Sequence, residues 1–97
     1  MRKLPSPIAF EWDKGNIEKS YVKHGITNKE AEEAFFNKPL KIFQDARHSE
    51  EEKRFLAYGT TNQKRNLTIV FTIRKQKIRV VSVRNQNKKE KRIYEKQ

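Results

Sequence analysis

Two segments dense in β-branched residues constrain the fold more than any other part of the chain. Residues 67–73 read LTIVFTI and residues 78–84 read IRVVSVR, compositions that are typical of β-strands. Only residues 74–77 separate the two segments, so we expect them to pair as an antiparallel hairpin. Strand alternation divides the first segment between two faces, one with Leu67, Ile69, Phe71 and Ile73 and the other with Thr68, Val70 and Thr72.

Three further strands are predicted ahead of this hairpin. Near the N-terminus Ile8, Phe10 and Trp12 alternate with other residues, as in a half-buried strand. Residues 40–45 and 54–58 predict two more, the latter closed by Gly59. A polar loop is expected at 46–51 and a turn at 60–66.

A short helix is predicted after the first strand. Asp13 can cap it by accepting from free backbone N–H groups, and Ile17, Tyr21 and His24 follow at helical spacing. Gly25 is expected to end the helix, because glycine adopts the left-handed conformation at little cost.

A second helix is predicted directly afterwards. Thr27 and Glu30 have the spacing of a capping box, and residues 37–39, which end in proline, stop the helix. Its buried stripe is expected to comprise Ala31, Ala34 and Phe35.

The C-terminal residues predict a strongly basic helix. Asn87 is a good N-cap, and Glu90 three residues later completes a box-like signal. The cations of this segment are Lys88, Lys89, Lys91, Arg92 and Lys96.

These elements give one α+β domain over residues 1–97, with residues 1–7 expected to be flexible. Two N-terminal helices should pack on one face of an antiparallel sheet, and the basic helix should follow the last strand. The other face of the sheet is then available for a ligand or a partner.

The formal net charge of +11 indicates which partner that face meets. A domain so basic usually binds a polyanion, because neutralising phosphates releases condensed counterions. Nucleic acid is the leading interpretation, ahead of an anionic membrane surface or an acidic protein, and a merely solvated lysine-rich surface is the alternative. The chain has no cysteine, no apolar run long enough to span a bilayer and no hydrophobic segment after its basic N-terminus, which favours a cytoplasmic protein.

The residue types favour metal-free RNA cleavage over other chemistries. We expect no metal site and no cofactor, because the two histidines lie far apart without a carboxylate cluster, and the three glycines form no phosphate-binding loop. A ribose 2′-OH can attack its neighbouring phosphate if a base, an acid and cations are in place.

Glu52 and Arg54 are candidates for a base and a phosphate clamp, with an exposed ion pair as the alternative. Arg79 and Arg84 interrupt an apolar strand, and a guanidinium suits phosphate. Their odd spacing sends them to opposite faces of a regular strand, so both can serve one site only if a bulge or the strand end redirects one.

The histidines and aromatic residues have competing interpretations. His48 lies in a polar loop that could bring it to the site, although an ordinary exposed loop histidine is the favoured interpretation. His24 is expected to be partly buried or to ease the end of its helix. Trp12, Phe35 and Phe36 are expected in the core.

The order and spacing of several motifs resemble the BrnT family, the ribonuclease toxins of bacterial BrnT/BrnA toxin–antitoxin pairs. The resemblance covers about residues 10–95. It rests on Phe10-Glu11-Trp12-Asp13, Lys23-His24-Gly25, Asp45, His48-Ser49, Glu52, Arg54-Phe55, Gly59, the strand segments around Val70–Thr72 and Ile78–Arg84, and the ending Lys88–Glu95. Gln86 and Asn87 depart from the alanine and threonine usual in the family, which leaves the docking angle of the last helix open.

The resemblance implies a RelE-like fold and a metal-independent endoribonuclease that inhibits translation. It also implies neutralisation by a BrnA-like ribbon-helix-helix antitoxin in a two-to-two complex, with operator DNA bound only through the antitoxin. Carried over to this chain, it points to Glu52, Arg54, Arg79, Arg84 and His48 for catalysis and to Lys23, His24, Lys88 and Lys89 for RNA binding. A noncatalytic module that binds nucleic acid or an antitoxin through the same basic face is the alternative.

Overall fold

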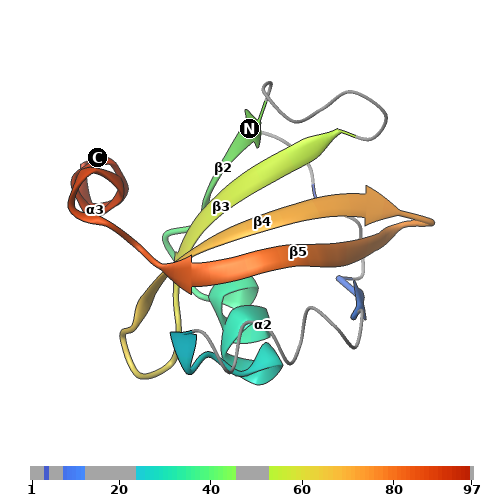
Figure 1. Cartoon of the computed structure of the whole chain (residues 1–97), viewed down its shortest axis with the longest axis horizontal. Helices are drawn as coiled ribbons and strands as arrows, with labels where there is room; N and C mark the ends of the chain where they lie inside the picture. The colour runs from blue at the N-terminus through green and yellow to red at the C-terminus, as the bar shows by residue number, and fades with distance from the viewer. Residues whose placement is uncertain (1–3, 5–7, 13–23, 46–52, 97) are drawn as a thin grey trace.

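The chain forms a five-stranded sheet in the order β1-β5-β4-β3-β2, with helix α2 packed on it and helix α3 at the end of β5 (Figure 1). The computed structural model describes residues 4, 8–12, 24–45 and 53–96. The elements are β1 Phe10–Glu11, α2 Asn28–Phe36, β2 Lys41–Asp45, β3 Arg54–Thr60, β4 Asn66–Arg74, β5 Lys77–Asn85 and α3 Lys88–Glu95. No helix within the described ranges is long and apolar enough to cross a membrane.

The predicted hairpin is confirmed as β4 and β5, which pair antiparallel from Leu67–Asn85 to Arg74–Lys77. Its turn consists of Lys75 and Gln76, whose φ angles are 52° and 62°. Positive φ at both central residues is the geometry whose twist matches two flanking antiparallel strands.

The prediction of a purely antiparallel sheet was wrong, because β1 pairs parallel with β5. Phe10 lies opposite Ile78 and Glu11 opposite Arg79 at this edge. A parallel neighbour requires a long connection rather than a hairpin, and here most of the chain lies between the two strands. The alternation expected at Ile8, Phe10 and Trp12 is confirmed, since all three pack against the core.

Helix α2 covers one face of the sheet and contacts β3 and β4. Its predicted capping box is present, with Glu30 N donating to Thr27 Oγ1 at 3.1 Å and Thr27 N donating to Glu30 Oε1 at 3.0 Å. The predicted stripe is buried and joins one core cluster: Ile26, Ala31, Ala34, Phe35, Phe55, Ala57, Leu67, Ile69, Phe71, Ile78, Val80 and Val83.

Two residues near this helix depart from expectation. Gly59 does not close its strand but lies within β3, where a Cβ would come within 2.8 Å of the Ala34 carbonyl oxygen. Glycine therefore permits the close approach of helix and sheet rather than a turn. Phe36, expected in the core, is 63% exposed, because it follows the buried Phe35 onto the outer side of the helix.

The predicted first helix lies outside the described residues, apart from His24 at its end. Gly25 follows with φ +66°, the left-handed conformation expected of it. The Arg65 guanidinium donates to the carbonyl oxygens of His24 and Gly25, at 2.8 and 3.0 Å. Arg65 therefore satisfies helix-terminal carbonyl groups that lack intrahelical partners.

Candidate nucleic-acid interface

A bulge in β5 places Arg79 and Arg84 on the same face of the sheet. Val70 pairs with Ser82, but the next residue, Phe71, pairs with Val80, so Val81 is an extra residue in β5. A bulge of this kind shifts alternation by one position. The bulge therefore brings Arg79 and Arg84 to one face, although their odd spacing would send them to opposite faces of a regular strand.

This face is the one turned away from α2. Arg84 pairs with Thr68 and Arg79 pairs with Thr72, whereas α2 packs on the side of Leu67, Ile69 and Phe71. We call it the arginine face. Two rows are paired across β2, β3, β4 and β5: Lys41, Tyr58, Thr68 and Arg84; then Phe43, Leu56, Val70 and Ser82. A third row follows by strand alternation from the pairs Asp45–Arg54 and Thr72–Arg79, one residue beyond the last β3–β4 pair, Phe55–Phe71.

The structure brings Arg54 and Arg79 together and sets Arg84 apart. Extending the β3–β4 register by one residue beyond the pair Phe55–Phe71 places Arg54 in the row of Arg79, which puts their Cα atoms about 10 Å apart by strand spacing. Arg84 lies two rows away, about 13 Å along the strand. Asp45 and Glu11 take the register positions beside Arg54 and Arg79. The pair Arg54 and Arg79 is therefore the candidate phosphate site among the described residues.

Arg84 joins helix α3 to the sheet through an ion pair with Glu90. Its guanidinium donates to both carboxylate oxygens of Glu90, at 2.6 and 2.7 Å. The same carboxylate accepts from Thr68 Oγ1 and from the backbone N–H of Asn87, each at 2.9 Å. This second capping box confirms that Asn87 starts the helix. Because the Arg84 side chain is still 41% exposed, it can also meet a ligand.

The contacts between Arg84 and Glu90 shift the pKa values of both groups. Burial alone would raise the pKa of Glu90, but hydrogen bonds from Arg84, Asn87 and Thr68 outweigh it and lower the pKa below the ordinary value. The hydrogen bond to Glu90 raises the pKa of Arg84. Burial, and then the Glu90 charge, raises the pKa of Tyr58, which shares a row with Arg84. Tyr58 is therefore a neutral phenol at physiological pH.

Acidification is expected to loosen α3. A glutamate with a lowered folded-state pKa contributes stability above its ordinary value of 4.5, and this contribution is lost as pH falls through the folded-state pKa. The free energy of unfolding should therefore fall more steeply below pH 4.5 in the wild type than in Glu90→Gln, which should be less stable at pH 7 by about 1 kcal/mol. Urea unfolding at several pH values measures this. Parallel curves for the two proteins would contradict it.

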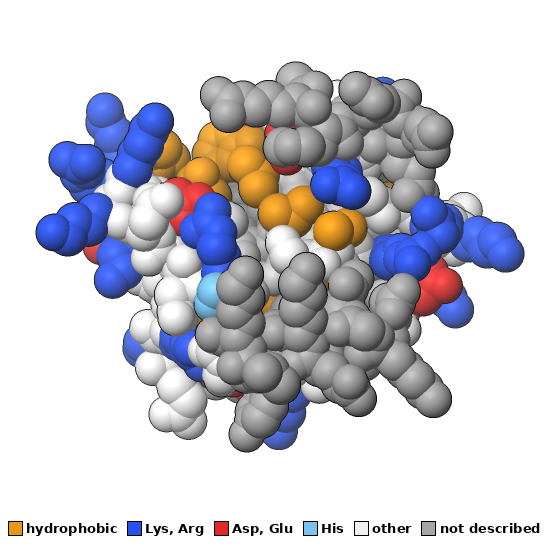
Figure 2. Space-filling view, in the orientation of Figure 1, with side chains coloured by type: hydrophobic (Ala, Val, Ile, Leu, Met, Phe, Trp, Pro, Cys, Tyr) orange, Lys and Arg blue, Asp and Glu red, His pale blue; other side chains and the backbone are white. Residues whose placement is uncertain are grey.

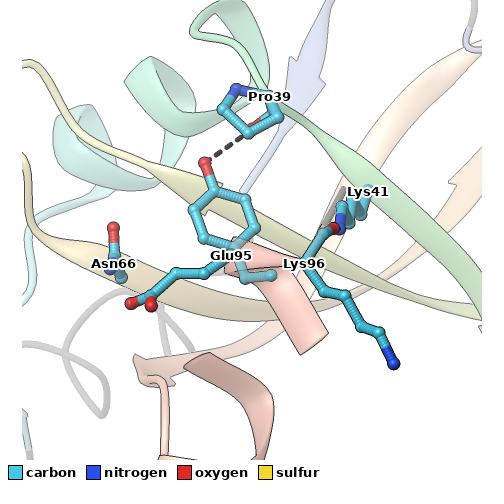
Figure 3. Close-up of a pocket in the computed structure, with 6 residues that line it drawn as sticks. Pro39, Lys41, Asn66, Glu95 and Lys96 are labelled. Carbon is cyan, nitrogen blue, oxygen red and sulfur yellow. Dashed lines mark hydrogen bonds between the residues drawn. The ribbon is translucent and has the colours of Figure 1, made fainter. Parts of the chain in front are cut away.

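Further contacts dock the C-terminal end of α3 (Figure 3). Tyr94 Oη donates to the Pro39 carbonyl oxygen at 2.6 Å. Lys41 Nζ donates to the carbonyl oxygens of Ile93, at 2.7 Å, and Lys96. A pocket of about 470 Å³ lies here, lined by Pro39, Lys41, Asn66, Tyr94, Glu95 and Lys96. Since docking the helix occupies its Lys41 ammonium and Tyr94 hydroxyl groups, we assign it no ligand.

Lys88 and Lys89 are exposed in the first turn of α3, as a role in RNA binding requires. Cations at the N-terminus of a helix oppose its dipole and do not stabilise it.

The remaining candidate residues are placed less fully. Lys23, His48 and Glu52 lie outside the described residues. His24 is half-buried, as expected, and its carbonyl group is bound by Arg65. Within the described ranges no three His, Cys, Asp or Glu side chains lie close enough to hold a metal ion.

The sequence did not indicate that Glu90 pairs with Arg84 or that Tyr58 is buried beside that pair. Glu90 was recognised only as a capping residue, although a buried carboxylate so close in sequence to Arg84 is a signal for an ion pair. Tyr58 carried no signal, because an aromatic residue in a strand is usually core.

Comparison with known proteins relates the chain to a family of ribonucleases. A family model described as the ribonuclease toxin BrnT of type II toxin–antitoxin systems matches residues 12–90. The crystal structure of the ribonuclease toxin BrnT from Brucella abortus superposes with a TM-score of 0.61. It is 19% identical, and the match covers 84% of this chain and 99% of that one, so it shows a shared fold. No curated protein sequence matches the chain.

Proposed function

Because the chain belongs to the BrnT family of ribonuclease toxins from type II toxin–antitoxin systems, we propose that it is a metal-independent endoribonuclease that uses its arginine face. The observation that carries the proposal is the bulge at Val81, which places Arg79 in a row with Arg54 and turns Arg84 to the same face. Guanidinium groups fixed on a strand are suited to stabilising the charge that develops on a phosphate.

The proposed reaction needs no group beyond the RNA and the protein side chains. The ribose 2′-oxygen forms a bond to the adjacent phosphorus while the bond from phosphorus to the leaving 5′-oxygen breaks. A base removes the 2′-OH proton and an acid protonates the 5′-oxygen, which leaves a 2′,3′-cyclic phosphate and a 5′-hydroxyl. Arg54 and Arg79 hold the phosphate, while Glu52 and His48 are the candidates for base and acid.

The proposal extends to the biological partners. We infer that cleavage inhibits translation in the cytoplasm, and that a BrnA-like ribbon-helix-helix antitoxin neutralises the toxin in a two-to-two complex that alone binds operator DNA. A basic protein of net charge +11 is suited to both RNA and an antitoxin with an acidic segment. Lys23, His24, Lys88 and Lys89 are the proposed RNA contacts outside the arginine face.

Replacing one 2′-OH in the substrate tests the mechanism. Once a cleavage site is mapped in an RNA, the same oligonucleotide with a single 2′-deoxy nucleotide before that phosphate should resist cleavage there, since it lacks the nucleophile. Sites elsewhere in the molecule serve as the internal control. Cleavage at the deoxy position at an unchanged rate would show that water, not the ribose, attacks.

A further inference from the structure

An apolar row crosses the arginine face between its two charged rows. It consists of Phe43, Leu56 and Val70, which lie opposite one another on β2, β3 and β4. Phe43 is 40% exposed, and the other two are half-buried. Figure 2 shows exposed hydrophobic side chains running across the sheet from β2 toward β4, with Lys and Arg side chains on both sides.

Phe43 is held as a platform rather than packed as core. Its ring lies 5.2 Å from the ring of Tyr58, centroid to centroid, at an interplanar angle of 55°. Tyr58 is only 7% exposed and therefore fixes the ring from the protein side. An aromatic ring so supported loses little freedom when a ligand stacks on it.

The charges around the row indicate what the ligand is. Arg54 and Arg79 lie in the next row, about 7 Å away along the strands. Lys41 and Arg84 lie at the same distance on the other side, but both are engaged by helix α3, so the cations for a phosphate are those of Arg54 and Arg79. Single-strand binding proteins combine aromatic rings for the bases with cations that follow the backbone. One exposed ring in one row is far too small for a stable protein interface, which needs about 800 Å² from each partner.

We propose that Phe43 stacks against an unpaired base of single-stranded RNA whose neighbouring phosphate is held by Arg54 and Arg79. The inference rests on the proposed function, because it assigns a base-binding position to the same face. It adds a class of substrate: a strand whose bases are free to stack, and not a duplex, whose bases are already stacked on one another.

The test measures binding of a fluorescein-labelled, 2′-O-methylated single strand, which cannot be cleaved, and of the same sequence as a duplex. Phe43→Ala and Phe43→Leu are expected to weaken single-strand binding roughly tenfold or more, and Phe43→Trp to preserve it. Duplex binding should change less than about twofold, since it depends mainly on phosphate contacts. Phe36→Ala is the matched control, because Phe36 is an exposed ring on α2 at the opposite face.

Salt dependence separates failure of this inference from failure of the proposed function. Phe43→Ala should leave the slope of log affinity against log salt unchanged, whereas Arg79→Ala should reduce it by about one. Normal single-strand binding by Phe43→Ala, with weak binding by Arg79→Ala, would contradict base stacking on Phe43. It would still support the arginine face as the RNA-binding site. If Arg54→Ala and Arg79→Ala also bind normally, the arginine face itself is not the RNA site. Melting temperatures of all variants exclude unfolding as the cause.

Discussion

Replacing Arg79 by alanine is expected to lower the rate of RNA cleavage about 100- to 1,000-fold, the usual effect of removing one fixed group that stabilises transition-state charge. Arg79 is half-buried on β5 and lies in a row with Arg54. Arg79→Lys keeps the charge but loses the planar fork, so it should fall between the wild type and alanine. Single-turnover cleavage of a labelled RNA measures the effect.

Stability and charge need separate controls in that experiment. Lys29→Ala removes one exposed cation from α2, on the opposite side of the sheet, and should leave the cleavage rate within about twofold, because that charge is distant and screened. Because Arg79 is half-buried and has contacts within the protein, the melting temperature of Arg79→Ala is measured beside its activity. An inactive variant that has also lost several degrees would point to a structural role instead.

Arg84→Ala is a less direct test of catalysis than Arg79→Ala, although the sequence makes both arginines candidates. Arg84 forms two hydrogen bonds to Glu90, a carboxylate in a largely buried side chain. Removing the arginine leaves that carboxylate without its principal partner, which is costly in itself. Lost activity in this variant could therefore arise from the release of α3, and Arg54 and Arg79 are better positions for testing catalysis.

The largest expected effect on stability comes from Phe71→Ala. Phe71 is fully buried, and its ring lies 5.2 Å from Phe35 of α2 and 5.4 Å from Phe55 of β3. Deleting a buried ring leaves a cavity and typically costs about 3–5 kcal/mol. Since small domains are stable by only about 5–15 kcal/mol, this variant should be close to unfolding at physiological temperature.

Ile73→Ala is the matched control for this prediction. Ile73 lies on the same strand and the same face, two residues further on, but it is 36% exposed. Its truncation should cost about 1 kcal/mol or less, because little area is removed from water. Urea denaturation of both variants measures the difference. A smaller loss for Phe71→Ala than for Ile73→Ala would contradict the position of the core described here.

Local signals in the sequence predicted local structure well. The capping boxes at Thr27–Glu30 and Asn87–Glu90 and the β4–β5 hairpin are all confirmed, because each depends on residues only a few positions apart. The parallel pairing of β1 was missed, since it joins segments nearly 70 residues apart with no local pattern to indicate it. The role of Gly59 was missed for the same reason, as its close neighbour Ala34 lies on another element.

The candidate site was predictable in its residue types but not in its geometry. The arginines stood out as cations within an apolar strand, and their odd spacing meant that both could serve one site only if a bulge or the strand end redirected one. Nothing in the sequence placed that bulge at Val81, because bulges follow from how two strands fit together. The pairing of Arg84 with Glu90, and the supported ring of Phe43, likewise arise only when strands and helix are assembled.

The most direct test of the central claim is incubation of the purified protein, free of any antitoxin, with a 5′-labelled single-stranded RNA in excess EDTA. We predict fragments that end in 2′,3′-cyclic phosphate, formed by the wild type and almost absent with Arg79→Ala. Intact RNA, bound tightly and released by salt, would contradict a self-sufficient ribonuclease. It would instead indicate a binding module or a toxin that requires the ribosome.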